Sequence, residues 1–158
     1  MNKAFDPDAF MLAAATNDLR RFVSRPQLAT LRRCAKGEEG VWFIARMVEL
    51  AAEIAAMPKT YEQDGKGDAA IVHLHYFTAS ADWYITERDM ETEQHQAFGL
   101  ADLFRDGGEL GYISIVELIQ HNAELDLHWT PRPLAVYARA SASSSIGWRA
   151  ARPVPWAI

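Results

Sequence analysis

The spacing of apolar residues changes once along the chain, close to residue 70. Before that point apolar side chains recur every three or four residues, which places them on one face of an α-helix. The clearest helix runs from Val41 to Ala55 and is closed by Met57-Pro58, because proline cannot continue a helix. Three shorter helices are predicted before it: one over residues 7–15 opened by Asp6-Pro7, one carrying Leu19, Phe22 and Val23 behind a Thr16 or Asn17 cap, and one carrying Leu28, Leu31 and Ala35.

After residue 70 apolar and polar residues alternate, which is typical of β-strands. Gly99 interrupts one of these segments and predicts a bulge or a close approach of another backbone. Ser114 with Glu117 forms a capping box, which predicts a helix through Gln120. Strands are predicted within residues 71–77, 83–87, 96–103, 110–113 and 124–129.

Together these elements predict an α+β fold, with an N-terminal helical subdomain packed beside a small, mostly antiparallel sheet with one further helix. The helical subdomain covers residues 1–60, and the sheet domain covers residues 71–135. Residues 61–70 are polar and contain glycine, so they are predicted to form a loop or linker. Residues 136–158 form a low-complexity, arginine-bearing tail.

The net charge of −5 is unevenly distributed over the 158 residues. Residues 1–70 hold ten acids and ten bases, residues 71–130 hold eleven acids and two bases, and residues 131–158 hold four arginines and no acid. The acidic middle argues against direct binding to a phosphate backbone there, and its simplest interpretation is a solvated sheet face. The alternative is an acidic surface that binds a protein. The residues predicted to form this surface are Glu87, Asp89, Asp102, Asp106, Glu109, Glu124 and Asp126.

The compartment is predicted from cysteine use and from the apolar segments. The single Cys34 excludes an internal disulfide and a cysteine-based zinc site, which fits a reducing compartment. The longest candidate membrane span is broken by Arg46, Glu49 and Glu53. We therefore expect a soluble cytoplasmic protein with no membrane partner.

Histidines and carboxylates raise a catalytic alternative. In one strand Glu124, Asp126 and His128 would share a face, as would His73 and His75 in another. Such a group suits zinc, manganese or iron if the strands are neighbours, although histidines spaced in this way also occur on solvated faces or hydrogen-bonded in a core. A metal-assisted hydrolase or nuclease would use Glu87, Asp102, Glu109, Asp126 and His128. No nucleophile with an adjacent base is visible, so we favour a non-catalytic protein without a cofactor.

Basic residues gather in the helical half of the chain, between Arg20 and Lys36. Two short helices flanking a turn are compatible with a helix-turn-helix motif that reads DNA with Gln27, Thr30 and Arg33. The alternative is a helical hairpin with a basic solvent face. Nucleic acid is thus a possible partner of these helices.

Several short motifs follow one another in the sheet half: Trp83-Tyr84-Ile85-Thr86-Glu87, residues 97–103 and 109–114, Glu117-Leu118 and residues 126–131. In these motifs and their order, over about residues 70–135, the chain resembles an uncharacterised family that is catalogued as domain of unknown function 2958. Phe104-Arg105-Asp106-Gly107-Gly108 replaces a turn that is richer in glycine and proline in the family. The resemblance implies a location on plasmids, integrative elements or phage, often beside anti-restriction genes, and it brings no established activity or catalytic residues.

The resemblance and the acidic segment lead to one main functional expectation. The protein is expected to be a mobile-element or phage accessory protein that inhibits host defence, either CRISPR or restriction, without catalysis. It would bind a host complex that processes nucleic acid, occupying a nucleic-acid site with its acidic surface. The alternatives are the metal-assisted enzyme and a DNA-binding accessory regulator.

Overall fold

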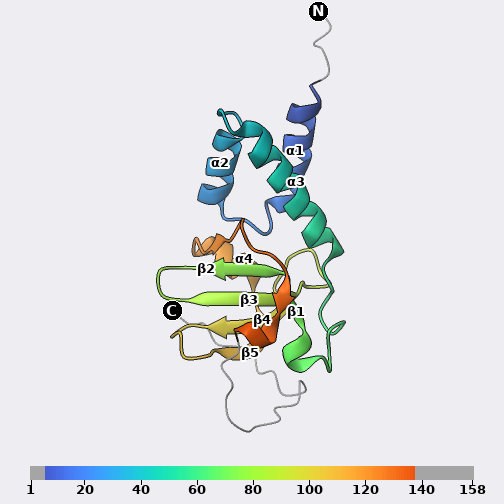
Figure 1. Cartoon of the computed structure of the whole chain (residues 1–158), viewed down its shortest axis with the longest axis vertical. Coiled ribbons are helices and arrows are strands. Elements are labelled where there is room, and N and C mark those ends of the chain that lie inside the picture. Colours follow the sequence, from blue (N-terminus) through green and yellow to red (C-terminus); the bar gives the residue numbers. More distant parts are fainter. Residues whose placement is uncertain (1–5, 138–158) are drawn as a thin grey trace, which may run out of the picture.

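The computed structural model describes residues 6–137, and the tail from residue 138 onward lies outside this range. Three helices lie at one end of the described chain, and the sheet lies at the other (Figure 1). Asp6 caps the first helix by accepting hydrogen bonds from the backbone N–H groups of Asp8 and Ala9, as the Asp-Pro pair predicts. The helices are α1 Pro7–Leu19, α2 Arg25–Cys34 and α3 Gly40–Ala56.

The helix boundary predicted at Thr16 or Asn17 is wrong. Helix α1 continues to Leu19, because Ala15 and Leu19 extend the same buried face and nothing forces the backbone out of helical geometry between them. The N–H groups of Phe22 and Val23 then donate to the Leu19 carbonyl and close the helix with a tight turn.

The larger sheet has five strands among the described residues, in the order β5–β4–β3–β2–β6, and each strand is antiparallel to its neighbours. A second sheet pairs two very short strands, β1 and β7. These findings confirm the α+β class. The strands are β1 Ile71–Val72, β2 Leu74–Phe77, β3 Asp82–Glu87, β4 Ala97–Asp102, β5 Glu109–Ile113, β6 Glu124–Leu125 and β7 Arg132–Pro133; α4 spans Ile115–Gln120, and 3-10 turns span η1 Gly67–Ala69 and η2 Leu134–Val136.

The last predicted strand ends early. Strand β6 stops at Leu125, and the Asp126 side chain then accepts a hydrogen bond from the backbone N–H of His128 at 2.9 Å. An aspartate that bonds the backbone two residues on makes a turn, and this turn breaks the alternation that the sequence suggested. Glu124, Asp126 and His128 therefore do not share a strand face.

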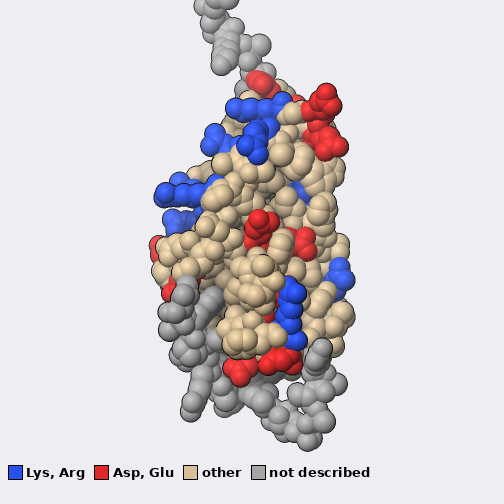
Figure 2. All heavy atoms as spheres, turned by 90° about the vertical axis from the view of Figure 1, so that its left-hand side faces the viewer, with Lys and Arg blue, Asp and Glu red and all other residues tan. Residues whose placement is uncertain are grey.

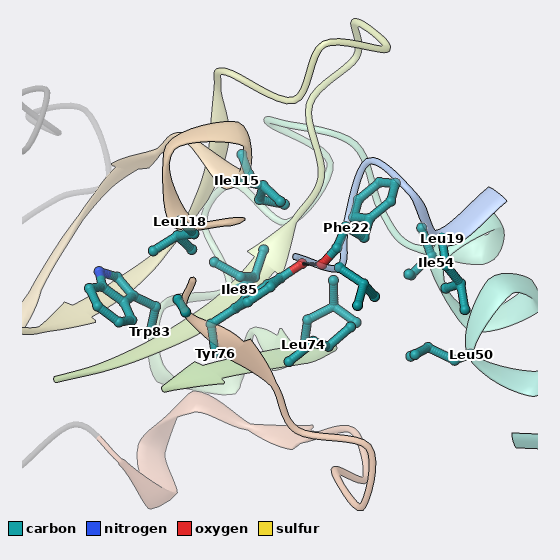
Figure 3. Packing of buried hydrophobic residues seen from close by; sticks show 14 of the residues in the cluster. Leu19, Phe22, Leu50, Ile54, Leu74, Tyr76, Trp83, Ile85, Ile115 and Leu118 are labelled. Carbon is teal, nitrogen blue, oxygen red and sulfur yellow. Dashed lines mark hydrogen bonds between the residues drawn. The ribbon is translucent and has the colours of Figure 1, made fainter. Parts of the chain in front are cut away.

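One hydrophobic cluster joins the helices to the sheet (Figure 3). Leu50 and Ile54 of α3 reach it from the helical end, while Leu74 and Ile85 reach it from the sheet. The buried Tyr76 hydroxyl donates to the Phe22 carbonyl at 2.7 Å, so the two halves are also linked by a hydrogen bond. The helical subdomain is therefore packed directly on the sheet.

The predicted linker is tied to the sheet by a buried side chain. Gln63 is 1% exposed, and its amide nitrogen donates to the carbonyls of Ile71 and Thr86. Its amide oxygen accepts from the Ile71 N–H at 2.8 Å. The segment before β1 thus covers one end of the sheet, although its composition suggested an exposed loop.

Gly99 confirms the predicted close approach. A Cβ added there would lie 2.1 Å from the carbonyl oxygen of Tyr84 on the neighbouring strand.

Among the described residues, no helix is both long and apolar enough to span a bilayer.

Candidate functional site

The sheet face turned away from the helices carries a histidine held between two carboxylates. His75 lies on β2; its Nδ1 is 3.2 Å from Asp126 Oδ2, and its Nε2 is 3.0 Å from Asp82 Oδ1. The second oxygen of Asp82 lies 3.3 Å from Arg105 Nε. Both ring nitrogens are therefore occupied, and His75 has no nitrogen left for a metal or a substrate.

Aromatic rings surround this histidine. The His75 ring stacks on Tyr84 at 4.9 Å between centroids and lies 5.0 Å from Trp129. Tyr137 stacks on Tyr84 at 4.4 Å between centroids and lies tilted against Trp129 at 5.2 Å. Burial raises the pKa of Tyr84 to about 12, and the nearby Asp82 carboxylate acts in the same direction, so this phenol stays protonated at neutral pH.

The His75 cluster is best explained as a clamp. It connects β2, β3 and the turn that follows β6 through side chains, and the aromatic rings belong to a second buried cluster on the same sheet face. The sequence did not indicate Asp82 as a partner, since only strand register places it opposite Phe77 and beside His75.

The other predicted metal ligands lie elsewhere. The His128 ring stacks on Trp42 of α3 at 5.7 Å. His73 follows β1, where its backbone N–H donates to the Ile85 carbonyl, and burial lowers the pKa of its side chain. Over residues 6–137, no three His, Cys, Asp or Glu side chains are placed to hold a metal ion.

The five carboxylate and histidine candidates for catalysis are not brought together. Glu87 is 2% exposed and accepts hydrogen bonds from the N–H groups of Tyr61 and Gln63. Burial raises the pKa of Glu87, and these two bonds oppose the shift. Its role in the structure is to anchor the segment before β1 to the end of β3.

Of the other candidates, Asp102 and Glu109 lie on neighbouring strands but face opposite ways. Asp102 accepts from the Asp106 N–H at 3.0 Å within the turn that follows β4. Glu109 is exposed and pairs with Ala101, and therefore points to the opposite side of the sheet from Asp102. Asp126 belongs to the His75 clamp, and His128 stacks on Trp42 of α3. The five candidates therefore occupy separate places and do not form one acid–base site.

The predicted acidic surface is smaller than the sequence suggested. Glu87 is buried, and so is Asp89, which is 5% exposed and whose two oxygens accept hydrogen bonds from the N–H groups of Glu91 and Gln96. Both acids are therefore excluded from the surface. Loop acids look exposed in a sequence, but here they satisfy backbone groups inside the fold. The predicted members that stay at least partly exposed are Asp102, Asp106, Glu109, Glu124 and Asp126.

The basic residues of α2 and of the turns that follow α1 and α2 differ from the acids, because they stay exposed. All six side chains are exposed, and within the described chain none of them forms an ion pair. Among these six residues of the described chain, Arg21 is the one whose side chain donates a hydrogen bond, to the Thr92 carbonyl at 3.3 Å. Figure 2 shows Lys and Arg side chains gathered over the helical end of the molecule. We call this the basic surface; its members are Arg20, Arg21, Arg25, Arg32, Arg33 and Lys36.

The structure removes one residue from the predicted DNA-reading helix. The Gln27 amide nitrogen donates to the Leu125 carbonyl at 2.7 Å, and its oxygen accepts from the Leu125 N–H at 3.0 Å. Gln27 is thus committed to the edge of the sheet and cannot contact a base. Thr30 and Arg33 remain exposed.

The larger part of the chain matches a known protein family. A family model described as protein of unknown function (DUF2958) matches residues 44–146. The chain belongs to this family. The matched region starts within α3 and ends at residue 146. It therefore extends beyond residues 70–135, which carry the resemblance in the sequence, on both sides. No curated protein and no solved structure matches the chain.

Proposed function

We propose that this protein is a non-catalytic accessory protein that contacts nucleic acid through its basic surface. The observation that carries the proposal is a set of six exposed cations on α2 and on the turns that follow α1 and α2, without ion-pair partners among residues 6–137. Like charges held together repel each other, and a polyanion relieves this repulsion while releasing its own counterions. Residues 71–130 hold eleven acids and two bases, so the sheet would contribute little to this binding.

The salt dependence of binding gives a direct test. With about four to six phosphates neutralised on duplex DNA, the logarithm of the affinity should fall with the logarithm of salt concentration with a slope of about −4 to −5. Fluorescence anisotropy of a labelled 20-base-pair duplex and a single strand between about 50 and 200 mM salt measures this slope.

Charge-neutralising variants locate the contact. The double variant Arg25→Gln with Arg33→Gln should reduce the slope by about 2, because each cation accounts for about one counterion. Lys66→Gln removes an exposed cation outside the helices and serves as the control. If neither the duplex nor the single strand binds at about 50 mM salt, the proposal is contradicted.

A second candidate is inhibition of a host defence complex through the acidic residues. Strand register favours it: Glu124 and Asp82 both pair with Phe77, and Asp82 pairs with Asp102, so three carboxylates follow one row across β6, β3 and β4. Such a row could occupy a site meant for a phosphate backbone, in a protein carried by a mobile element or phage and acting in the cytoplasm.

Charge reversal separates the two candidates. Glu124→Lys should abolish both co-purification with a CRISPR or restriction complex and protection of incoming DNA, if the acidic row is the binding surface. The same variant should leave oligonucleotide binding by the basic surface intact. Failure of the unmodified protein to co-purify with such a complex or to protect DNA would exclude the second candidate.

A further inference from the structure

A hollow of about 510 Å³ lies between α1 and α2, inside the basic surface. Its floor is apolar and includes Leu12 and Ala13 of α1. Pockets that hold small organic molecules typically measure about 300–1,000 Å³, so this space exceeds what a bare inorganic anion would fill.

Two polar side chains of α1 also line the hollow, Thr16 and Asn17. The Thr16 hydroxyl is buried and has no hydrogen-bond partner among the described residues. Buried hydroxyl groups are nearly always paired, so this hydroxyl gains its missing partner if the Thr16 side chain rotates toward a ligand in the hollow.

The rim of the hollow is cationic. Arg20 approaches from the end of α1, while Arg32 and Lys36 come from the end of α2 and the turn behind it. Among the described residues that line the hollow there is no carboxylate, and none of the three cations is in an ion pair. An apolar floor, an unpaired hydroxyl and three converging cations match a ligand with an apolar ring and an attached anion.

We propose that the hollow binds one nucleotide of a nucleic-acid strand. The phosphate lies against Arg20, Arg32 and Lys36, the base or sugar lies on the floor formed by Leu12 and Ala13, and the Thr16 hydroxyl donates to an oxygen of the nucleotide. The inference rests on the proposed nucleic-acid binding and adds to it a specific seat for one unit of the strand. A single strand, whose bases are free to leave the stack, is the preferred ligand.

Filling the hollow tests this without changing any charge. Ala13→Leu places three extra carbons on the floor, and the matched control Ala14→Leu adds the same bulk at a neighbouring exposed residue that does not line the hollow. Against a fluorescein-labelled 20-nucleotide single strand, Ala13→Leu should weaken binding about tenfold, the effect of losing one well-placed base. The salt slope should not change, because no cation is removed. Ala14→Leu should bind like the unmodified protein, and thermal melting of both variants checks that each is folded.

A second probe separates failure of this inference from failure of the proposed function. Adenosine monophosphate should shift the amide NMR signals of residues 12–17 in the unmodified protein and in Ala14→Leu, but not in Ala13→Leu. If Ala13→Leu retains full strand binding while Arg25→Gln with Arg33→Gln loses it, the basic surface binds nucleic acid and the nucleotide seat is refuted.

Two further outcomes are equally decisive. If no strand binds but adenosine monophosphate still gives the Ala13-dependent shifts, the hollow takes a free nucleotide, and both the proposed function and the seat for a strand are refuted. If neither probe binds and the protein is instead retained by vesicles of anionic lipid in an Ala13-dependent way, the hollow serves a lipid headgroup and the inference is overturned.

Discussion

Replacing Gln63 with Met should destabilise the protein far more than the same replacement at Gln27. The two substitutions are chemically identical, since each exchanges a side-chain amide for an apolar chain of similar length. Their surroundings differ. Gln63 is buried and serves the N–H and C=O of Ile71 and the C=O of Thr86, whereas Gln27 is half-buried and serves the two backbone groups of Leu125.

The magnitude follows from the backbone groups left without partners. A buried polar group that loses its partner costs about 1–3 kcal/mol, with the lower end applying where water can reach it. The Thr86 carbonyl contact is fully buried, and the two Ile71 contacts are partly buried. Gln63→Met should therefore cost about 3–5 kcal/mol, against about 1–2 kcal/mol for Gln27→Met.

Urea unfolding followed by circular dichroism measures both values, and thermal melting gives an independent check. For a chain of this size 1 kcal/mol corresponds to about 2–4 °C in Tm, so Gln63→Met should melt roughly 10 °C below the unmodified protein. Equal costs for the two variants, or a larger cost for Gln27→Met, would refute the reasoning that burial of the orphaned backbone groups decides the effect.

Three further changes test other contacts. Tyr76→Phe should cost about 1–2 kcal/mol in urea unfolding, because it removes the buried hydroxyl that bonds the helical half; an unchanged midpoint would mean that this bond adds nothing. Gly99→Ala should prevent stable folding, since its Cβ would lie 2.1 Å from the Tyr84 carbonyl oxygen; a soluble variant with an unaltered melting curve would contradict this close approach of β4 to β3. Glu87 has a raised pKa in the folded state, so its contribution to the free energy of unfolding should fall as pH rises from the unfolded value of about 4.3 through the folded pKa. The difference in that free energy between the unmodified protein and Glu87→Gln should drift accordingly between about pH 4 and pH 7, and a constant difference would argue against the shift.

The sequence predicted the elements better than their contacts. The change of spacing near residue 70 separated helices from strands because burial on one face imposes a period of 3.6 or of 2. Asp6 and Ser114 were identified as helix caps because capping depends on neighbours within three residues. The strand after Glu124 was predicted too long, since Asp126 bends the chain through a side-chain bond that leaves the apolar alternation unchanged.

The candidate site was predicted less well, because its contacts join residues that lie far apart in the sequence. Gln63 and Glu87 look like surface residues in a sequence, and only the folded path shows that each satisfies backbone groups far from it. The position of Asp82 beside His75 depends on strand register, and the hollow beside Thr16 depends on how two helices cross. The basic surface was visible in the sequence, because it consists of residues close together in the chain.

The contact between Gln27 and Leu125 has a consequence for self-association. A strand at the border of a sheet offers unpaired N–H and C=O groups to any other chain, and this is a common origin of aggregation. Gln27 fills that role with a side chain of α2, so a foreign strand finds no free donor or acceptor at Leu125. In Gln27→Met the border of β6 is open, and the variant should form oligomers as its concentration rises, although its free energy of unfolding falls by only about 1–2 kcal/mol. The helical half therefore covers the core of the sheet and also prevents β6 from pairing with strands of other protein molecules.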